Sequence, residues 1–489
     1  MTTTPNPAPA NRLSSVEHIV VLMLENRSFD HMLGLLYADS GNVSPADQPF
    51  DGLTGKEGNP AKDGSPVTVF AIDSTTTNRD RMPGADPGEG YQATNLQLFG
   101  SDAAPTPPVA TNQGFVQNFA YTLGWESQKP SWAPLPGTVA ADIMGIHSPA
   151  MLPVLSALAK GFAVCDQWFS SVPTETLPNR AFACAATSQG HMDDTTKTFT
   201  SPSIFGSMSA HGLAWKIHGY TSSPLTRLTF ADTSAAAASC FGLFKDFKKD
   251  AATGSLAAFT FLEPDWSPAG NSQHPNYSLA AGEQLIHDVY YALRNGPKWA
   301  QTLLIITYDE HGGCYDHVPP PTTAVPPDRS VGEFGFDFKR FGVRVPTVLV
   351  SPLIPPGTVF RVPANATPLD HTAILKTVQT RWTLPALTAR DAAAVDIGAA
   401  LTLTAARTDD PLVGVVVPKA PHVDPSKVSP SHLEQVHAEL VARLPVPDGA
   451  GGSYHAMPQL QTSADARAYI DARVAAWEAS LQASAPASA

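Results

Sequence analysis

The sequence has few cysteines and no long hydrophobic segment, and both absences narrow the classes of protein it can encode. Its cysteines (Cys165, Cys184, Cys240 and Cys314) are scattered through 489 residues without a C-x-x-C spacing. This pattern excludes a disulfide framework and a zinc cluster, so we expect reduced, mostly buried thiols. No apolar run is long enough to span a membrane, and the N-terminus "MTTTPNPAPANRLSS" lacks a signal-peptide pattern. We therefore expect no transmembrane segment and a cytoplasmic chain, or a secreted one only if its N-terminus was trimmed.

Positive charge is also scarce. Lys and Arg total 31 against 44 Asp and Glu, which gives a net charge of −13 and a pI near 5.5. This balance argues against nucleic acid or an anionic membrane surface as the partner. Hydrophobic residues make up 43% of the chain and charged residues only 15%, which indicates a globular protein and excludes a disordered one.

Short apolar runs alternate with helical patterns through most of the chain. Fully apolar strands that alternate with helices indicate a mostly parallel sheet covered on both faces. The predicted strands are Ile19–Leu24, Val67–Ile72, Phe162–Cys165, Leu213–His218, Ala258–Leu262, Thr302–Tyr308 and Val345–Val350. The predicted helices between them include Pro149–Lys160, Asn179–Ala186, Ala280–Arg294 and Thr372–Arg381.

The alternating pattern stops after about residue 407. Two amphipathic helices are expected beyond it, near Ser431–Arg443 and Ala464–Ser480. We therefore predict a three-layer α/β/α sandwich in residues 1–407 and a C-terminal helical extension in residues 408–489.

Polar side chains follow two of the predicted strands where each strand ends. Glu25 and Asn26 come directly after the first strand, and Asp309 and Glu310 follow the strand that ends at Tyr308. In an open α/β sheet, residues just past the carboxyl ends of strands line the ligand crevice. Clustered carboxylates repel one another, and oxygen ligands favour a hard cation such as Ca²⁺, Mg²⁺ or Mn²⁺. Taken singly, each pair is also compatible with a solvated surface turn.

A third stretch, "SSVPTETLPNRAFACAATS", places hydroxyl groups before a helix that we expect to start near Pro178. Thr174 and Thr176 are both candidate nucleophiles there, and threonine is also an ordinary helix cap. A helix N-terminus offers backbone amides to an anion such as phosphate. A cation, a hydroxyl and an anion site together indicate a phosphoryl-transfer centre.

Five segments resemble one known family. They are "EHIVVLMLENRSFDHMLG", "PTETLPNRAFACAATS", "YDEHGGCYDHVPPP", "VPTVLVSPLIPPGTV" and "LDHTAILKTVQTRW". They look like the bacterial phosphatidylcholine-type phospholipase C and acid phosphatase superfamily, which also includes the plant non-specific phospholipases C. The resemblance implies an alkaline-phosphatase-like fold. It also implies hydrolysis of phosphate monoesters, or of the phosphodiester of phospholipids, through a Ser/Thr nucleophile at a metal centre.

The resemblance also assigns roles to individual residues. It makes Thr176 the nucleophile and His274, in "NSQHPNYS", a phosphate contact and proton donor. The implied metal ligands are Glu25, Asn26, Thr176, Asp309 and Glu310. The expected substrate contacts are Asn26, Glu89, Arg180, His218 and His274. We further expect Arg27 to brace the carboxylates from behind.

The chain departs from the family pattern at Glu89, where "DPGEGY" carries a carboxylate in place of a histidine. A carboxylate repels a dianionic phosphomonoester and tolerates a monoanionic diester or a cationic headgroup better. His218 could take over part of the missing histidine's role. We therefore favour a metal-dependent phosphoesterase that acts on a phospholipid headgroup or another small phosphate ester, with diesters preferred. The alternatives are an acid phosphatase acting on monoesters and a non-catalytic binder of phosphorylated or choline-bearing ligands.

Overall fold

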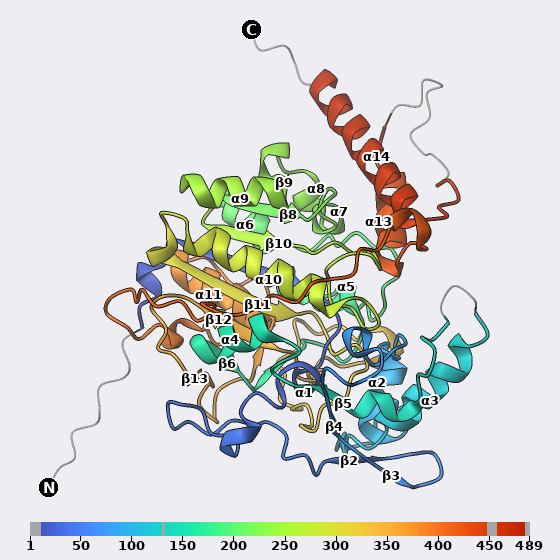
Figure 1. Ribbon diagram of the computed structural model, residues 1–489. Helices are drawn as coiled ribbons and strands as arrows, with labels where there is room; N and C mark the ends of the chain where they lie inside the picture. Colours follow the sequence, from blue (N-terminus) through green and yellow to red (C-terminus); the bar gives the residue numbers. More distant parts are fainter. Residues whose placement is uncertain (1–10, 130–132, 447–456, 485–489) are drawn as a thin grey trace, which may run out of the picture.

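The computed structural model describes residues 11–129, 133–446 and 457–484. The largest sheet in these residues has eight strands in the order β13-β6-β12-β11-β1-β10-β8-β9 (Figure 1). Strand β12 runs antiparallel to both of its neighbours, and the other pairs are parallel. The strands are β1 (His18–Leu24), β6 (Ala163–Cys165), β8 (Trp215–Gly219), β9 (Phe241–Leu243), β10 (Phe259–Leu262), β11 (Thr302–Tyr308), β12 (Thr347–Val350) and β13 (Thr358–Val359). The predicted, mostly parallel sheet is confirmed.

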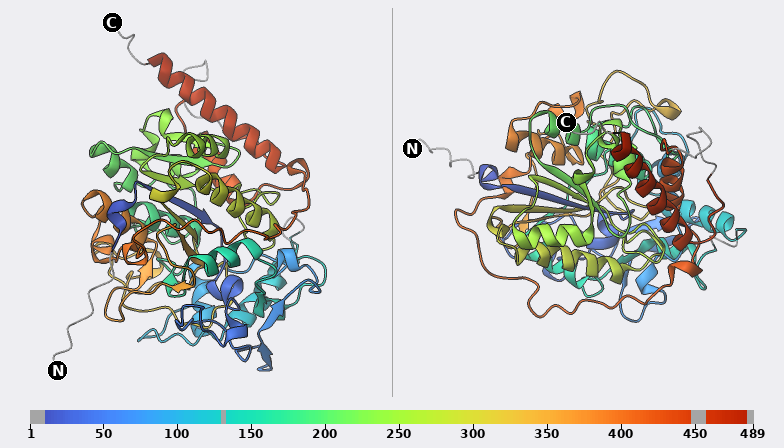
Figure 2. Two further views of the ribbon diagram at one scale, coloured as in Figure 1. Left: turned by 60° about the vertical axis from the view of Figure 1, so that its left-hand side comes forward. Right: turned by 90° about the horizontal axis from the view of Figure 1, so that it is seen from above.

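Helices cover both faces of the sheet, which confirms the predicted α/β/α sandwich (Figure 2). On one face, α10 packs against α4 and α9; on the other, α5 packs against α6 and α11. Strands β1 and β11 are buried along their whole length between these layers, as their unbroken apolar sequences require. The helices are α4 (Pro153–Gly161), α5 (Thr176–Ala185), α6 (Ile204–Ala210), α9 (Phe244–Thr253), α10 (Leu279–Arg294) and α11 (Thr372–Trp382).

The predicted strand Val67–Ile72 is wrong as a member of the central sheet. The segment forms two short strands that pair elsewhere, β3 with β2 and β4 with β5. Its side chains are largely exposed and do not alternate as a buried strand would. The remaining strands are β2 (Gly58–Pro60), β3 (Pro66–Thr68), β4 (Phe70–Ile72), β5 (Gly145–His147), β7 (Trp168–Phe169) and β14 (Leu369–Asp370). The remaining helices before the C-terminal pair are α1 (Phe29–Leu33), α2 (Tyr91–Phe99), α3 (Phe115–Glu126), α7 (Thr226–Thr229), α8 (Ala231–Ser234) and α12 (Ala389–Ala393).

Two helices end the chain, α13 (His432–Ala442) and α14 (Ser463–Ser484), close to their predicted bounds (Figure 1). They pack on each other, and their apolar side chains join Leu177, Trp266 and nearby residues of the main body in one hydrophobic cluster. Whether residues 408–489 form a separate domain stays a prediction. No helix within the described ranges combines the length and apolarity needed to cross a membrane. All four cysteines are free, and three of them are buried, as expected.

Candidate active site

The sheet register brings the two predicted carboxylate pairs together. Strands β1 and β11 are parallel neighbours, with Leu24 opposite Tyr308, so Glu25 and Asp309 leave the sheet side by side. Both carboxylates are buried. Two strands that end in register therefore place like charges next to each other in the protein interior, an arrangement that needs a compensating positive charge.

Asn26 turns the chain at this point in a strained conformation. Its φ of 56° lies in the left-handed region, which is uncommon for a residue other than glycine. Its backbone N–H donates to Asp309 Oδ1 at 2.9 Å, and its side-chain amide donates to Glu89 Oε2 at 2.5 Å. Gly312 makes room for the turn, since a Cβ there would lie only 2.0 Å from the Asn26 carbonyl oxygen. The turn thus holds Asn26 between two carboxylates, with its backbone N–H on Asp309 and its side-chain amide on Glu89.

Thr176 is the first residue of α5, so the helix begins two residues before the predicted start at Pro178. Proline is tolerated in a first helical turn because its missing N–H has no partner there anyway. Asn179 holds the preceding loop: its side-chain amide donates to the carbonyl oxygens of Val172, Thr174 and Glu175 at 2.8–3.1 Å. The Thr176 hydroxyl is directed at Asn26 Oδ1, 3.2 Å away.

The two candidate threonines differ in what their hydroxyls contact. Thr174 Oγ1 donates to the carbonyl oxygen of Met192 at 2.7 Å, away from the carboxylates. The helix N-terminus is also less open to an anion than the sequence suggested. The N–H of Leu177 donates to Asp194 Oδ1 at 2.6 Å, and the N–H of Asp194 donates to Glu175 Oε2 at 2.6 Å. Thr176 is therefore the threonine that faces the site.

Two arginines hold roles that the sequence assigned differently. Arg180 was expected to bind substrate, but it lies behind the carboxylates: its Nε donates to Asp309 Oδ2 at 2.9 Å, and its ring-stacking partner is Trp266. Arg27 was expected to brace the carboxylates. Instead it donates to backbone carbonyls, at 2.6 Å to Gln273 and 3.1 Å to His274. Arg180, on α5, supports Asp309, and its expected contact with substrate stays a prediction.

A cavity of about 720 Å³ opens over these residues. It takes in Glu25, Asn26, Glu89, Thr176 and His274, five of the predicted site residues. The other lining residues are Asp86, Glu126, Ala133, Glu175, Asp193, Asp194, Thr195, Pro268, Asn276, Tyr277 and the segment from Val428 to Leu433. Asp309 and Glu310 lie next to the cavity. Asp309 contacts the lining residue Asn26, and Glu310 lies within hydrogen-bond reach of the lining residue Glu89.

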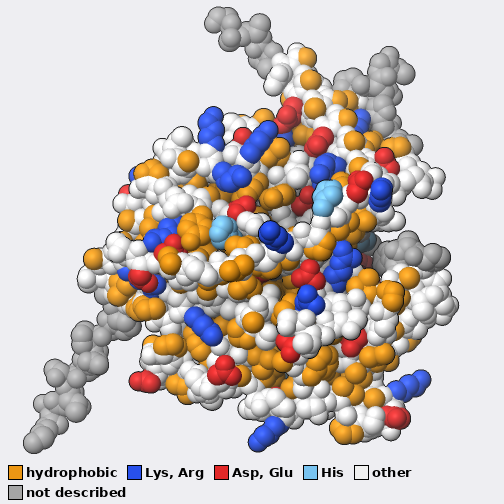
Figure 3. All heavy atoms as spheres, viewed as in Figure 1, with side chains coloured by type: hydrophobic (Ala, Val, Ile, Leu, Met, Phe, Trp, Pro, Cys, Tyr) orange, Lys and Arg blue, Asp and Glu red, His pale blue; other side chains and the backbone are white. Residues whose placement is uncertain are grey.

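The cavity is acidic, whereas charges of both signs are interspersed on the outer face in Figure 3. Burial, with the neighbouring Asp309, raises the pKa of Glu25 to about 7. Burial and nearby carboxylates also raise the pKa of Glu89 and of Glu310 well above the usual range, and Glu89 lies within hydrogen-bond reach of Glu310. These groups repel one another, so a bound cation would stabilise their ionised forms.

The donor set fits a hard divalent ion. Two buried carboxylate oxygens, Glu25 Oε2 and Glu310 Oε1, have no hydrogen-bond donor among the described residues. Buried polar atoms are normally satisfied, so an orphaned pair in one cluster points to a missing positive partner. Carboxylate, amide and hydroxyl oxygens are the ligands that Ca²⁺, Mg²⁺ and Mn²⁺ prefer.

His218 is a further expected substrate contact. It lies on β8, where its Nδ1 is 3.2 Å from the carbonyl oxygen of Leu243 and its ring meets Phe247 edge-on. Burial lowers the pKa of His218 to about 4. His218 is not among the residues that line the cavity, and the expectation that it contacts substrate stays a prediction.

Sequence reasoning missed the residues that reach the cavity from far along the chain. The segment 428–433, at the start of α13, lines it opposite Thr176 and His274. Asp86 lies 3.8 Å from His274 Nε2. The C-terminal segment carries no motif, whereas Asp86 begins the stretch "DPGEGY", whose family resemblance could have drawn attention to it.

Comparisons with known proteins agree with this geometry. Non-specific phospholipase C6 of Arabidopsis thaliana is 36% identical over 420 residues, covering 82% of this chain and 75% of that protein. Non-specific phospholipase C1 of the same plant is 38% identical over 77% of this chain and 69% of that protein. Phospholipase C A of Mycobacterium tuberculosis (strain ATCC 25618 / H37Rv) is 28% identical over 86% of this chain and 85% of that protein.

Among solved structures, the phosphonate monoester hydrolase of Silicibacter pomeroyi overlaps 51% of this chain and 72% of its own, with 13% identity and a TM-score of 0.32. The family model described as Phosphoesterase family matches residues 16–385. The expected resemblance and the expected hydrolysis of phosphate esters are thereby confirmed. The chain belongs to the phosphoesterase family, whose members here include the plant and mycobacterial phospholipases C.

Proposed function

We propose that this protein is a metal-dependent phosphoesterase of the phospholipase C type, with Thr176 as its nucleophile. The observation that supports it best is a buried hydroxyl in the cavity lining, beside a cluster of carboxylates with unpartnered oxygens. The Thr176 hydroxyl contacts Asn26, and Glu25 Oε2 and Glu310 Oε1 lack donors. A protein that only bound its ligand would have no need of a nucleophile at that point.

Glu25, Asn26, Thr176, Asp309 and Glu310 would hold the ion. When bound, a hard divalent ion would lower the pKa of the threonine hydroxyl and offset charge on the phosphate group. Arg180 keeps Asp309 in place through its Nε, and the strained Asn26 turn aims the side-chain amide into the cavity. The chain thus fixes the ligand atoms before any ion binds.

Thr176 would release its hydroxyl proton to water, and its Oγ1 would attack the phosphorus in line with the leaving alcohol. The new Oγ–P bond forms as the P–O bond to the leaving group breaks, and the alcohol takes a proton from His274. Water then hydrolyses phospho-Thr176, returning the hydroxyl and releasing the phosphate product. His274 is held for this role by Arg27, which binds its carbonyl oxygen, and by a ring contact with Tyr277 at 4.7 Å.

Glu89 supports a preference for diesters. It lies in the cavity, 2.5 Å from the Asn26 side-chain nitrogen, as the sequence suggested. With an ion bound, its ionised carboxylate would oppose a second negative charge on the substrate, which a monoester carries and a diester lacks. The phospholipases C among the relatives make a phospholipid headgroup a suitable diester to test.

The direct test is a panel of a phosphomonoester, a soluble phosphodiester and phosphatidylcholine vesicles, each assayed with and without chelator. We expect hydrolysis that stops with chelator, returns with a hard divalent ion and is fastest with diesters. Quenched reactions analysed by mass spectrometry should carry phosphate on Thr176. Faster monoester hydrolysis would favour an acid phosphatase, and binding without any turnover would favour the non-catalytic alternative.

A further inference from the structure

The C-terminal segment Val428–Leu433 forms one wall of the cavity that holds Thr176 and His274. It lies outside the matched family region, residues 16–385. We propose that this segment is part of the substrate site and that His432 contacts the phosphate group of the substrate. The inference rests on the proposed function for its substrate class, and the test below separates the two.

The segment is anchored firmly enough to act as a wall. Ser431 and Glu434 cap each other, with the Glu434 N–H donating to Ser431 Oγ at 3.0 Å and the Ser431 N–H donating to Glu434 Oε2 at 2.9 Å. The start of α14 holds the preceding residues, because the Ser463 N–H donates to the carbonyl oxygen of Val428 at 3.0 Å. These bonds fix α13 to begin at His432.

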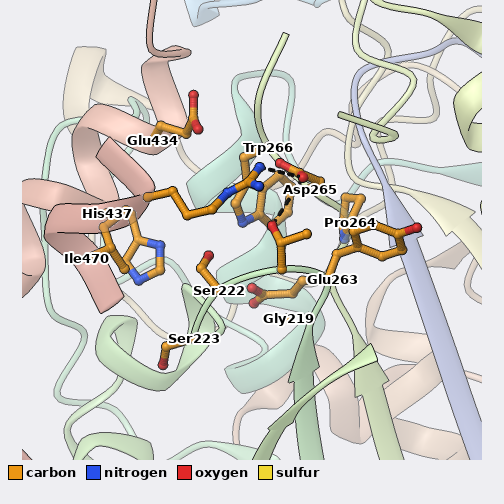
Figure 4. A pocket seen from close by; sticks show the side chains of 13 residues that line it. Gly219, Ser222, Ser223, Glu263, Pro264, Asp265, Trp266, Glu434, His437 and Ile470 are labelled. Atoms are coloured by element: carbon orange, nitrogen blue, oxygen red, sulfur yellow. Dashed lines mark hydrogen bonds and ion pairs between the residues drawn. The ribbon is translucent and has the colours of Figure 1, made fainter. Parts of the chain in front are cut away.

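The helix pair is docked on the same elements that build the site. Leu433 and Val436 share a hydrophobic cluster with Leu177, which follows the nucleophile, and with Trp266, which stacks on Arg180. Figure 4 shows the junction beside this cluster, where Glu434, His437 and Ile470 face Asp265 and Trp266. Arg467 crosses it and donates to Asp265 Oδ2 at 2.8 Å. The α13–α14 pair therefore packs directly on residues that border the site.

The cavity lining is rich in carboxylates, so a residue there that can carry positive charge matters for binding an anion. Seven carboxylates line the cavity: Glu25, Asp86, Glu89, Glu126, Glu175, Asp193 and Asp194. Among the described lining residues, only His274 and His432 can carry positive charge. A phosphate ester is an anion, so within this lining its phosphate oxygens have two imidazoles as charged partners.

His432 lines the same cavity as Thr176 and His274. Burial raises the pKa of Asp86, and the charges of His274 and His432 both oppose that rise. A protonated histidine in the first turn is disfavoured by the helix dipole, so helix stability does not account for its position.

The test compares His432→Gln, His432→Lys and a matched control, His422→Gln, which changes an exposed histidine of the same extension outside the cavity. Full-length proteins are checked for equal metal content and equal thermal midpoints. The readouts are the affinity for inorganic phosphate by calorimetry, and KM and kcat for a soluble phosphodiester.

We expect His432→Gln to weaken phosphate binding about tenfold or more, as loss of a charge-assisted hydrogen bond implies, and to raise KM for the diester. His432→Lys should restore phosphate binding, and His422→Gln should match the wild type. Phosphate affinity and KM unchanged in His432→Gln would overturn the inference. If the wild type binds phosphate through His432 but hydrolyses no ester, the proposed function fails and the contact stands.

Discussion

Two clusters of carboxylates, each with members from residues 25–30 and 309–317, are organised in opposite ways. In the paired cluster (Asp30, Asp316, His317 and Arg344), Arg344 contacts Asp30 Oδ1 at 2.8 Å and Asp316 Oδ1 at 3.0 Å, and His317 Nδ1 lies 2.7 Å from Asp30 Oδ2. In the site cluster (Glu25, Glu89, Asp309 and Glu310), Arg180 Nε contacts Asp309 Oδ2 at 2.9 Å. His311 Nδ1 lies 3.2 Å from Glu310 Oε2, but burial lowers the pKa of His311 to about 3, so this histidine does not supply the positive charge that His317 supplies.

The difference shows how to tell a structural charge cluster from a functional one. A buried carboxylate needs a positive partner, and the paired cluster carries its own. The site cluster has more carboxylates than cations and leaves Glu25 Oε2 and Glu310 Oε1 without donors. Under the proposed function, a bound cation would supply the missing positive charge. Residue types alone do not reveal this, because both clusters read as Asp, Glu and His near strand ends.

The largest expected effect concerns the hydroxyl beside the site cluster. Thr176→Ala should lower kcat by roughly 1,000-fold or more, because it removes a covalent nucleophile. Thr174→Ala is the matched control and should keep most activity, since its hydroxyl only bonds the Met192 carbonyl. Both are measured as steady-state rates on a soluble phosphodiester. A larger loss in Thr174→Ala than in Thr176→Ala would show that the wrong threonine has been assigned.

The two clusters should respond oppositely to neutralisation. Asp30→Asn removes a partner from buried Arg344 and should lower the free energy of unfolding by about 3–5 kcal/mol, with activity per folded molecule near that of the wild type. Glu25→Gln should lower activity roughly 100-fold or more and change stability little in metal-free protein. Urea unfolding and rate assays on both variants check this. Equal losses of stability in Asp30→Asn and Glu25→Gln would contradict the distinction between a structural and a functional cluster.

The paired cluster should also impose a pH dependence on stability. Burial alone would lower the pKa of His317, but its hydrogen bonds to Asp30 and Asp51 outweigh burial and raise it to about 10. The native state therefore holds this proton more tightly than the unfolded chain, whose histidine pKa is about 6.5. The resulting stability is present in full below pH ~6.5 and is lost as pH rises through about 10.

His317→Gln should remove that component. Its free energy of unfolding, measured in urea between pH 6 and pH 10, should fall less steeply with pH than that of the wild type, by up to a few kcal/mol across the window. Parallel curves for the two proteins would mean that His317 is not protonated in the cluster.

The smallest expected effect is on substrate choice. Glu89→His removes a negative charge from the cavity and should raise the monoester-to-diester ratio of kcat/KM by about tenfold, a fraction of the repulsion possible at close range. Asp193→Asn, on the cavity rim, provides a charge-matched control and should shift the ratio less. An unchanged ratio in Glu89→His would withdraw the diester preference, and loss of activity on every substrate would make Glu89 a metal ligand.

The sequence predicted well what depends on local pattern. Strands β1 and β11 are mostly apolar and lie side by side in register in the sheet. The meeting of Glu25 with Asp309 could therefore be expected. Side-chain direction could not: Arg180, not Arg27, donates to Asp309, while Arg27 Nε donates to the carbonyl oxygen of Gln273. His432 was missed because it reaches the cavity only through the docking of a distant helix pair, which leaves no motif.

The most direct test of the central claim is a titration of metal-free protein with Mg²⁺, Ca²⁺ and Mn²⁺, followed by calorimetry and by phosphodiester hydrolysis in the same samples. The account predicts that activity is absent without ion and rises in step with ion binding. It predicts binding in the wild type and in folded Asp316→Asn, from the paired cluster, and binding at least about tenfold weaker in Glu25→Gln. Full activity in metal-free protein, or equal binding by Glu25→Gln and the wild type, would contradict it.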